Sequence, residues 1–199
     1  MKKLLAIAAI LVAGSFGSAV QAQDDISLGD PSTAGTGCPA GTVAASLTED
    51  GKSLSIAFDS FVAEAGGATN KTFDRKVCNV SIPVHVPQGL SISVLGIDYR
   101  GYNNIPAGAN TQFNVEYFFA GVRGPTFQKT FTGVLDDVYT IHNELTAQSI
   151  VWSKCGADVI LRTNPSIRVT TKQNKQAIAT VDSEDVSAAI IYSLQWKSC

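Results

Sequence analysis

The sequence has few charged residues, and it lacks the short motifs that mark several enzyme classes. Lys, Arg, Asp and Glu make up 16% of its 199 residues, and the formal net charge is −2. Without a basic excess to neutralise phosphates, nucleic acid is not an expected partner. No H-E-x-x-H, G-x-S-x-G or phosphate-binding glycine motif occurs, so a zinc protease is excluded and no α/β-hydrolase or P-loop enzyme is indicated.

Histidine is scarce as well, which leaves few candidates for acid–base catalysis. The two histidines are His85, on the polar side of an alternating run, and His142, near a predicted turn. We expect both on the surface. A dispersed Ser-His-Asp triad stays open as an alternative, because its members need not be close in sequence. We predict no catalytic residue, no metal and no cofactor, and so a protein that is not an enzyme.

A long apolar run occurs at the N-terminus and nowhere later. Residues 1–3 read "MKK", an apolar stretch follows, and "VQA" precedes Gln23. This order is typical of a secretory signal peptide, here residues 1–22 with cleavage after Ala22. An uncleaved anchor is the alternative, and the small residues of "VQA" argue against it. No later stretch approaches the roughly 18 apolar residues of a membrane helix. The predicted location is secreted or periplasmic, without a membrane span.

Cysteine is present in a number that suits an oxidising compartment. The four are Cys38, Cys78, Cys155 and Cys199, and two disulfides are expected. "WSKC" ends one strand-like run and "WKSC" ends the chain. Two neighbouring strands with matching ends would join Cys155 to Cys199, and elimination then pairs Cys38 with Cys78. Metal binding is the rival interpretation, but no two cysteines have a C-x₂₋₄-C spacing.

Alternation of apolar and polar residues predicts β-strands after Cys38. Residues 23–37 are rich in Gly, Ser and Thr and are predicted to be a flexible lead-in. In "VCNVSIPVHV", Val80, Ile82, Val84 and Val86 share one face. Similar short runs, among them "SIVW", are separated by turn residues, and no amphipathic helix is convincing. We predict an all-β domain over residues 38–199, an antiparallel β-sandwich of roughly nine or ten strands.

The stretch "GIDYRGYNN", residues 96–104, carries the densest set of functional groups in the chain. On an alternating strand Asp98 and Arg100 point one way and Tyr99 the other. One interpretation is a structural clamp in which Arg100 binds Glu116 of the next strand, followed by a turn at residues 102–104. The other is a shallow recognition surface of Tyr99, Arg100 and Tyr102 that binds sugar rings and an acid. The two interpretations are compatible.

Carboxylates offer the remaining catalytic and metal-binding possibilities. Glu116 lies in the apolar run "NVEYFF", where a half-buried carboxylate is either a functional acid or one half of an ion pair. Paired with an Asp it would make a glycosidase-like hydrolase, which is the alternative function. Asp136–Asp137 and residues 182–185 form acidic clusters in predicted loops. They are candidate calcium ligands, or simply solvated charges.

Taken together, the segments "GCPAGT", "LSIAFDSFVAEAG", "RKVCNVSIPVHVPQG", "IDYRG" and "LQWKSC" resemble the secreted proteins of domain of unknown function 4360, found in bacteria and filamentous fungi. The resemblance extends from about Cys38 to Cys199. Residues 98–101 match the family's Tyr-Arg-Gly segment, and the four cysteines match its framework. The family implies export and disulfides, and it implies no activity.

These observations favour a secreted, disulfide-bonded β-sandwich that acts as a non-enzymatic binding or structural module. The candidate binding residues are Asp98, Tyr99, Arg100, Tyr102 and Glu116. An extracellular polymer, a glycan or a surface protein is the expected partner.

Overall fold

The computed structural model describes residues 26–119, 121, 124–172, 174–181 and 189–199. The predicted signal peptide and its cleavage site lie outside these residues. Within them, fourteen strands and one short 3₁₀ turn, η1 (Gly67–Thr69), are present. The all-β prediction is therefore confirmed. No helix in the described ranges is long and apolar enough to cross a membrane.

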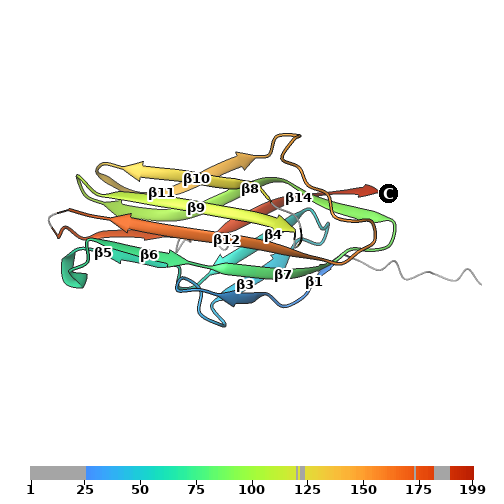
Figure 1. Ribbon diagram of the computed structural model, residues 1–199, viewed down its shortest axis with the longest axis horizontal. Helices are drawn as coiled ribbons and strands as arrows, with labels where there is room; N and C mark the ends of the chain where they lie inside the picture. The colour runs from blue at the N-terminus through green and yellow to red at the C-terminus, as the bar shows by residue number, and fades with distance from the viewer. Residues whose placement is uncertain (1–25, 120, 122–123, 173, 182–188) are drawn as a thin grey trace, which may run out of the picture.

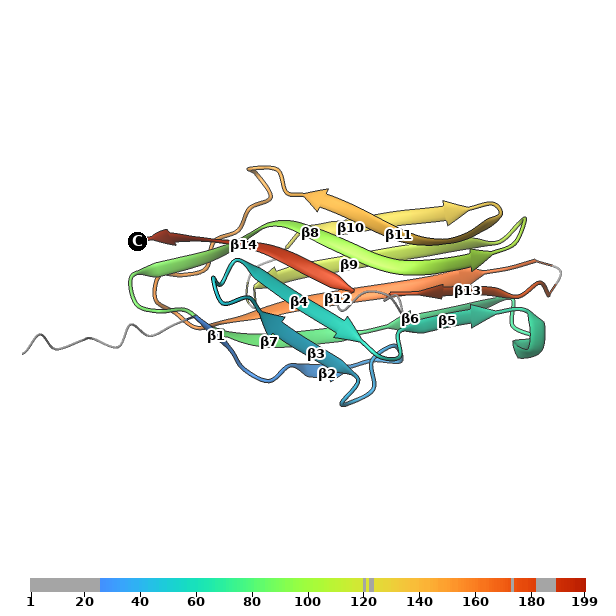
Figure 2. The same ribbon diagram turned by 180° about the vertical axis from the view of Figure 1, so that it is seen from behind.

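The strands form two antiparallel sheets that pack face to face and run along the long axis of the molecule (Figures 1 and 2). Sheet A contains β1 (Ser27–Leu28), β2 (Ser32–Ala34), β6 (Phe73–Val77), β7 (Asn79–His85), β9 (Asn110–Phe119), β10 (Thr126–Thr132) and β12 (Val159–Thr170). Sheet B contains β3 (Val43–Leu47), β4 (Ser53–Phe58), β5 (Val62–Ala65), β8 (Leu90–Ile105), β11 (Leu135–Glu144), β13 (Ala177–Thr180) and β14 (Ile190–Ser198).

The longest strand, β8, is the centre of sheet B. It pairs with β14 over residues 90–99, with β13 at Asn103 and Asn104, and with β11 over residues 96–105. Figure 2 shows β11 on one side of β8, and β14 and β13 on the other. β12 has the corresponding position in sheet A, because it pairs with β6, β7 and β9.

Alternation along the strands builds the core between the sheets. In β9 the burial pattern switches at every residue, so that Phe113, Val115, Tyr117 and Phe119 point inward. The predicted face of Val80, Ile82, Val84 and Val86 is likewise buried. Burial of such side chains stabilises the fold by roughly 1.5–3 kcal/mol each. Phe113, Tyr117 and Phe119 of β9 therefore contribute to core packing.

Both predicted disulfides are present. Cys38 bonds to Cys78, with their Cα atoms 5.4 Å apart, and Cys155 bonds to Cys199, with their Cα atoms 6.0 Å apart. The sequence separations of 40 and 44 residues correspond to about 4 kcal/mol of stabilisation for each bridge in the chain-entropy model.

The Cys155–Cys199 pairing is as predicted, but the two Trp-x-x-Cys segments are not neighbouring strands. "SIVW" is not a strand, because residues 145–158 contain none. Ser153 instead donates its amide to the carbonyl of Ile92 and accepts a hydrogen bond from the Ser91 hydroxyl. This segment runs along one edge of β8, and β14 pairs with the other edge. The first residues of β8 therefore lie between the two Trp-x-x-Cys segments.

The N-terminal part of the described chain is more ordered than its composition indicated. Residues 27–28 and 32–34, predicted to be flexible, form β1 and β2 on β7. These strands are short, and the run through Cys78 is divided into β6 and β7. For these reasons the prediction of nine or ten strands is too low.

Candidate functional site

The stretch over residues 96–104 is continuous strand throughout. Asp98, Arg100, Tyr102 and Asn104 point outward from sheet B, whereas Ile97, Tyr99, Gly101 and Asn103 point inward and are buried. The prediction that Asp98 and Arg100 share a face is correct. The predicted exit turn at residues 102–104 is wrong, because β8 continues to Ile105 and pairs with β11 to its end.

Gly101 brings the strands of sheet B close together at this point. A Cβ atom there would collide with the carbonyl oxygen of Thr180 and the hydroxyl of Tyr139. Tyr139 donates a 2.9 Å hydrogen bond to that same carbonyl beneath the glycine. Gly101 is therefore required for space between β8 and its neighbours.

Tyr99 is a core residue, so its proposed part in a recognition surface is wrong. Its side chain is fully buried. Its ring centroid lies 5.1 Å from that of Phe113 and 5.4 Å from that of Phe127, both in sheet A. Burial raises the pKa of its hydroxyl. Tyr99 joins the two sheets and cannot contact an external ligand.

Asp98 belongs to a charged cluster with β11. His142 lies directly opposite Asp98 in the strand register and donates from Nδ1 to Oδ1 of Asp98. Nε2 of His142 lies 3.4 Å from Oε1 of Glu144. The hydrogen bond to Asp98, together with Glu144, raises the pKa of His142. This histidine is on the surface, as predicted, and two carboxylates hold its ring.

Tyr102 forms a second polar cluster farther along the same face. Its hydroxyl donates to Oδ1 of Asp136, and the amide of Asn104 donates to the same hydroxyl at 3.3 Å. Asp136 raises the pKa of the Tyr102 hydroxyl. Val138 lies opposite Tyr102 in the register and is 57% exposed. The combination of a phenol ring and an exposed valine provides an apolar contact on a polar face.

Arg100 lies between these two clusters and is half-buried. In the described part of the chain its guanidinium has no ion pair, since the salt bridges found there involve other residues. Its nearest outward carboxylate on β8, Asp98, is bonded to His142. We call the outward side chains of these two strands the β8–β11 face: Asp98, Arg100, Tyr102, Asn104, Asp136, Val138, Thr140, His142 and Glu144.

Glu116 lies on the opposite side of the molecule, so the predicted Arg100–Glu116 clamp is wrong. β9 belongs to sheet A, where Glu116 is opposite Asn164 on β12 and Thr126 on β10. The loop after β8 carries the chain from one sheet to the other. Among the described outward neighbours of Glu116 there is no second carboxylate with which it could form a hydrolase pair.

Asp136 and Asp137, predicted to lie in a loop as candidate calcium ligands, lie in β11 instead. Asp136 and Asp137 are consecutive residues of β11 and therefore point to opposite faces of the strand. Residues 182–185 lie outside the described residues. Where the structure describes the chain, no group of three or more His, Cys, Asp or Glu side chains is arranged to hold a metal ion.

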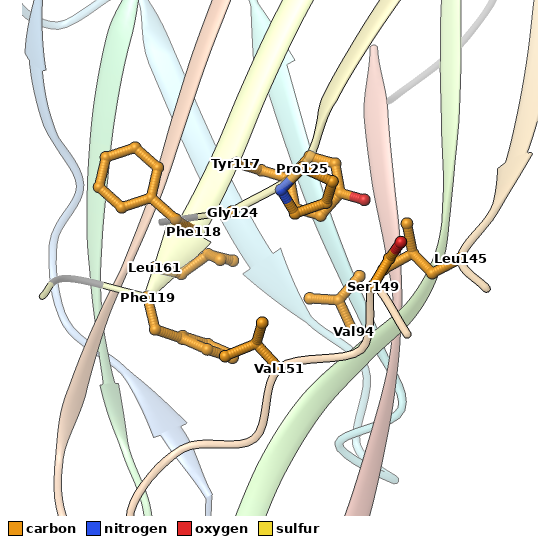
Figure 3. A pocket seen from close by; sticks show the side chains of 10 residues that line it. All are labelled: Val94, Tyr117, Phe118, Phe119, Gly124, Pro125, Leu145, Ser149, Val151 and Leu161. Atoms are coloured by element: carbon orange, nitrogen blue, oxygen red, sulfur yellow. The ribbon is translucent and has the colours of Figure 1, made fainter. Parts of the chain in front are cut away.

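Two depressions in the described part of the molecule lie away from the β8–β11 face. Figure 3 shows an apolar hollow between the sheets, lined by Val94, Tyr117, Phe119, Leu145, Val151 and Leu161 among others. Its volume of about 20 Å³ suits one or two water molecules and not a sugar. A larger depression of about 610 Å³ lies between β1 and the turn after β3. It contains none of the predicted site residues.

His142 and Asp136 were not predicted as members of the candidate site. "DDVYTIHNE" does alternate, and on a strand it places Asp136, Val138, Thr140 and His142 on one face. This pattern could have identified the face. It could not have identified β8 as the neighbouring strand, because many residues separate the two.

The structure thus defines a disulfide-bonded β-sandwich whose polar side chains lie on two broad outer faces. The chain belongs to the family described as domain of unknown function (DUF4360), which matches residues 24–199. It is 38% identical over 167 residues to an uncharacterized secreted protein of Arthroderma benhamiae (strain ATCC MYA-4681 / CBS 112371). That match covers 83% of this chain and 68% of the fungal protein.

Proposed function

We propose that this protein is exported and acts outside the cytoplasm as a non-enzymatic binding module, using the β8–β11 face. Support for export comes from the signal-peptide pattern of residues 1–22, the two disulfides and the secreted fungal relative. If export includes cleavage after Ala22, the intact mass of the protein recovered from the producing cells will correspond to a start at Gln23. A mass that retains residues 1–22 would contradict this part of the proposal.

The guanidinium of Arg100, which has no ion pair among the described residues, is the observation that carries the binding proposal. The carboxylates of Asp98 and Asp136 are each bonded within the face, so they leave the charge of Arg100 available to an external group. A guanidinium presents a planar fork of donors that suits a carboxylate. Tyr102 and Val138 add apolar contact beside it. The expected ligand is an extracellular polymer or surface protein with an acidic group and an apolar surface.

This proposal is tested by measuring retention of the purified protein on polysaccharides, cell-wall fractions and surface proteins. For a ligand retained by the wild type, Arg100→Gln should weaken binding about tenfold, because one charge-assisted interaction is lost. The control is Lys52→Gln, which removes one positive charge from the exposed turn after β3. Equal loss in both variants would indicate a general charge effect. Unchanged binding in Arg100→Gln would rule out the β8–β11 face.

A hydrolase built on Glu116 is not proposed. Glycosidases of the common type place two carboxyl groups on either side of the scissile bond. Glu116 has amide, hydroxyl and aromatic neighbours on its own face, namely Asn164, Thr126, Asn114 and Phe118. No described carboxylate faces it.

A further inference from the structure

Two arginines lie directly opposite each other on the outer face of sheet A. Arg75 of β6 is paired with Arg168 of β12, and both side chains are exposed. The amide of Thr171 donates to the carbonyl of Thr72, and that of Cys78 to Pro165. Hydrogen-bonded and non-hydrogen-bonded pairs alternate along an antiparallel ladder. Arg75 lies an odd number of residues from each of these two bonded pairs, so Arg75 and Arg168 form a non-hydrogen-bonded pair. In such pairs the Cβ atoms are only about 4.5–5.5 Å apart.

No carboxylate on the described part of this face compensates the pair of positive charges. The outward positions around it are neutral in the described chain: Phe73 and Val77 on β6, Ser166 and Thr170 on β12, and Asn110, Gln112 and Asn114 on β9. Asp74 is next to Arg75 in sequence, but its carboxylate lies 3.5 Å from Nζ of Lys71 and 3.9 Å from Nζ of Lys76. Like charges directly opposite one another are destabilising, and the chain as a whole is net negative.

An exposed aromatic ring and a row of neutral hydrogen-bonding groups adjoin the arginines. Phe73 is 54% exposed, and the guanidinium carbon of Arg168 lies 5.3 Å from the centroid of its ring. On the other side, Gln112 is opposite Arg168, and Thr130 of β10 is opposite Gln112. We call this set, Phe73, Arg75, Arg168, Gln112 and Thr130, the arginine row. It crosses four strands.

We propose that the arginine row binds the carboxylate groups of an acidic polysaccharide, a chain that contains uronic acid units. Two guanidinium groups match a carboxylate in charge and geometry. The exposed Phe73 ring can contact the apolar face of a sugar. Gln112 and Thr130 both donate and accept hydrogen bonds, as sugar hydroxyls do. The row lies on a broad sheet face, which suits a linear polymer.

This inference rests on the proposed binding function, but it concerns the opposite face of the sandwich from Arg100. Another explanation of the arginines is protection of β6, whose one partner among the described strands of sheet A is β12, because charge on an edge strand discourages aggregation. That explanation predicts no ligand. The two readings therefore differ in what a binding measurement should show.

The probe is an oligogalacturonate, compared with the same oligosaccharide in which the carboxyl groups are methyl esters. The wild type should bind the acid form at least about tenfold more tightly than the ester, because the charge-assisted hydrogen bonds are lost. Arg75→Gln/Arg168→Gln should lose the same preference. The control Arg162→Gln removes an exposed arginine on the same strand, outside the row, and should bind within about threefold of the wild type.

Several results would overturn the inference. These are equal affinity for the acid and the ester, unchanged binding in the double variant, or an equal loss in Arg162→Gln. Polyglutamate tests whether the carboxylates that the protein binds belong to a polypeptide. If the wild type binds polyglutamate as tightly as oligogalacturonate, the ligand is an acidic polypeptide instead. Far-ultraviolet circular dichroism and the unfolding midpoint confirm that each variant is folded.

The same experiment separates this inference from the general binding function. If Arg100→Gln loses oligogalacturonate binding and the double variant keeps it, the arginine row is wrong and the β8–β11 face remains. If the double variant loses oligogalacturonate binding while another ligand is still retained through Arg100, both proposals stand. If no extracellular ligand binds the wild type, both fail.

Discussion

The two outer faces of the sandwich differ in how their charges are neutralised. On the β8–β11 face, Asp98 is bonded to His142 and Asp136 to Tyr102, whereas Arg100 has no ion pair among the described residues. On the face of sheet A, Arg75 and Arg168 oppose each other, and no described carboxylate lies beside them on that face. The same alternation of strand residues builds both faces. Only on the β8–β11 face are most of the described charged side chains bonded to another side chain of the same face.

This difference separates groups that stabilise the fold from groups that are available to a ligand. A carboxylate bonded within its own face contributes to local order, and it gains little from a new partner. Two unpaired guanidinium groups are destabilising to each other, and an anion would relieve that repulsion. Three substitutions sharpen the comparison, beginning with the one of largest expected effect.

Gly101→Ala should disrupt the β8–β11 face and leave the arginine row intact. The added Cβ would collide with Thr180 and Tyr139, and overpacking of this kind costs about 1–3 kcal/mol. Urea unfolding measures the loss. Gly96→Ala, on the same strand, is the matched control, because the nearest atom to its added Cβ is a carbonyl oxygen at 3.5 Å. Equal stability of the two variants would show that Gly101 is not needed for close approach.

Arg75→Thr should stabilise the protein, by about 0.2–1 kcal/mol, since it removes a like charge opposite Arg168 and introduces a residue that favours strands. Arg168 keeps its contact with Phe73. The gain should be greater at low salt, where the repulsion is less screened. In the control Arg162→Thr the opposite residues are Ser81 and Phe118, so no repulsion is relieved. Lower stability of Arg75→Thr would contradict the account of the arginine row.

His142 on the β8–β11 face should make the stability of the protein depend slightly on pH, whereas the arginine row should contribute no such dependence. Its pKa is raised in the folded protein by Asp98 and Glu144. Protonated His142 therefore stabilises the folded protein fully at a pH below the pKa of histidine in the unfolded chain, about 6.5. This stabilisation is lost as the pH rises through the raised pKa of the folded protein. The difference in urea midpoint between wild type and His142→Gln should shrink with increasing pH. Asp98→Asn should remove most of this trend, and an unchanged trend would assign it to another group.

Local alternation made some features predictable from the sequence. The buried face of Val80, Ile82, Val84 and Val86 and the shared face of Asp98 and Arg100 follow from patterns within short segments. The two disulfide pairings are also as predicted, but the neighbouring strands from which Cys155–Cys199 was inferred do not exist. A period of two residues decides which side chains point together. It does not decide which of the two sets points to the core, and Tyr99 was placed on the surface for that reason.

The partners of each strand could not be predicted in the same way. Glu116 was expected beside Arg100 because β9 follows β8 in the chain. The loop between them instead crosses to the other sheet, and β8 pairs with strands that come much later. The arginine row was missed for the same reason, because Arg75 and Arg168 are distant in sequence and meet only through the pairing of β6 with β12.

The position of β14 in the chain has a consequence for the order of folding. β14 lies between β4 and β8 in sheet B, yet both of those strands are synthesised long before it. The centre of sheet B therefore cannot close until Ile190–Ser198 have left the ribosome. Such long-range pairing slows folding, and it keeps the earlier strands from completing their sheet during synthesis. In a chain of this topology we expect β4 and β8 to be joined into one sheet late in folding, because β14 has to pair with both.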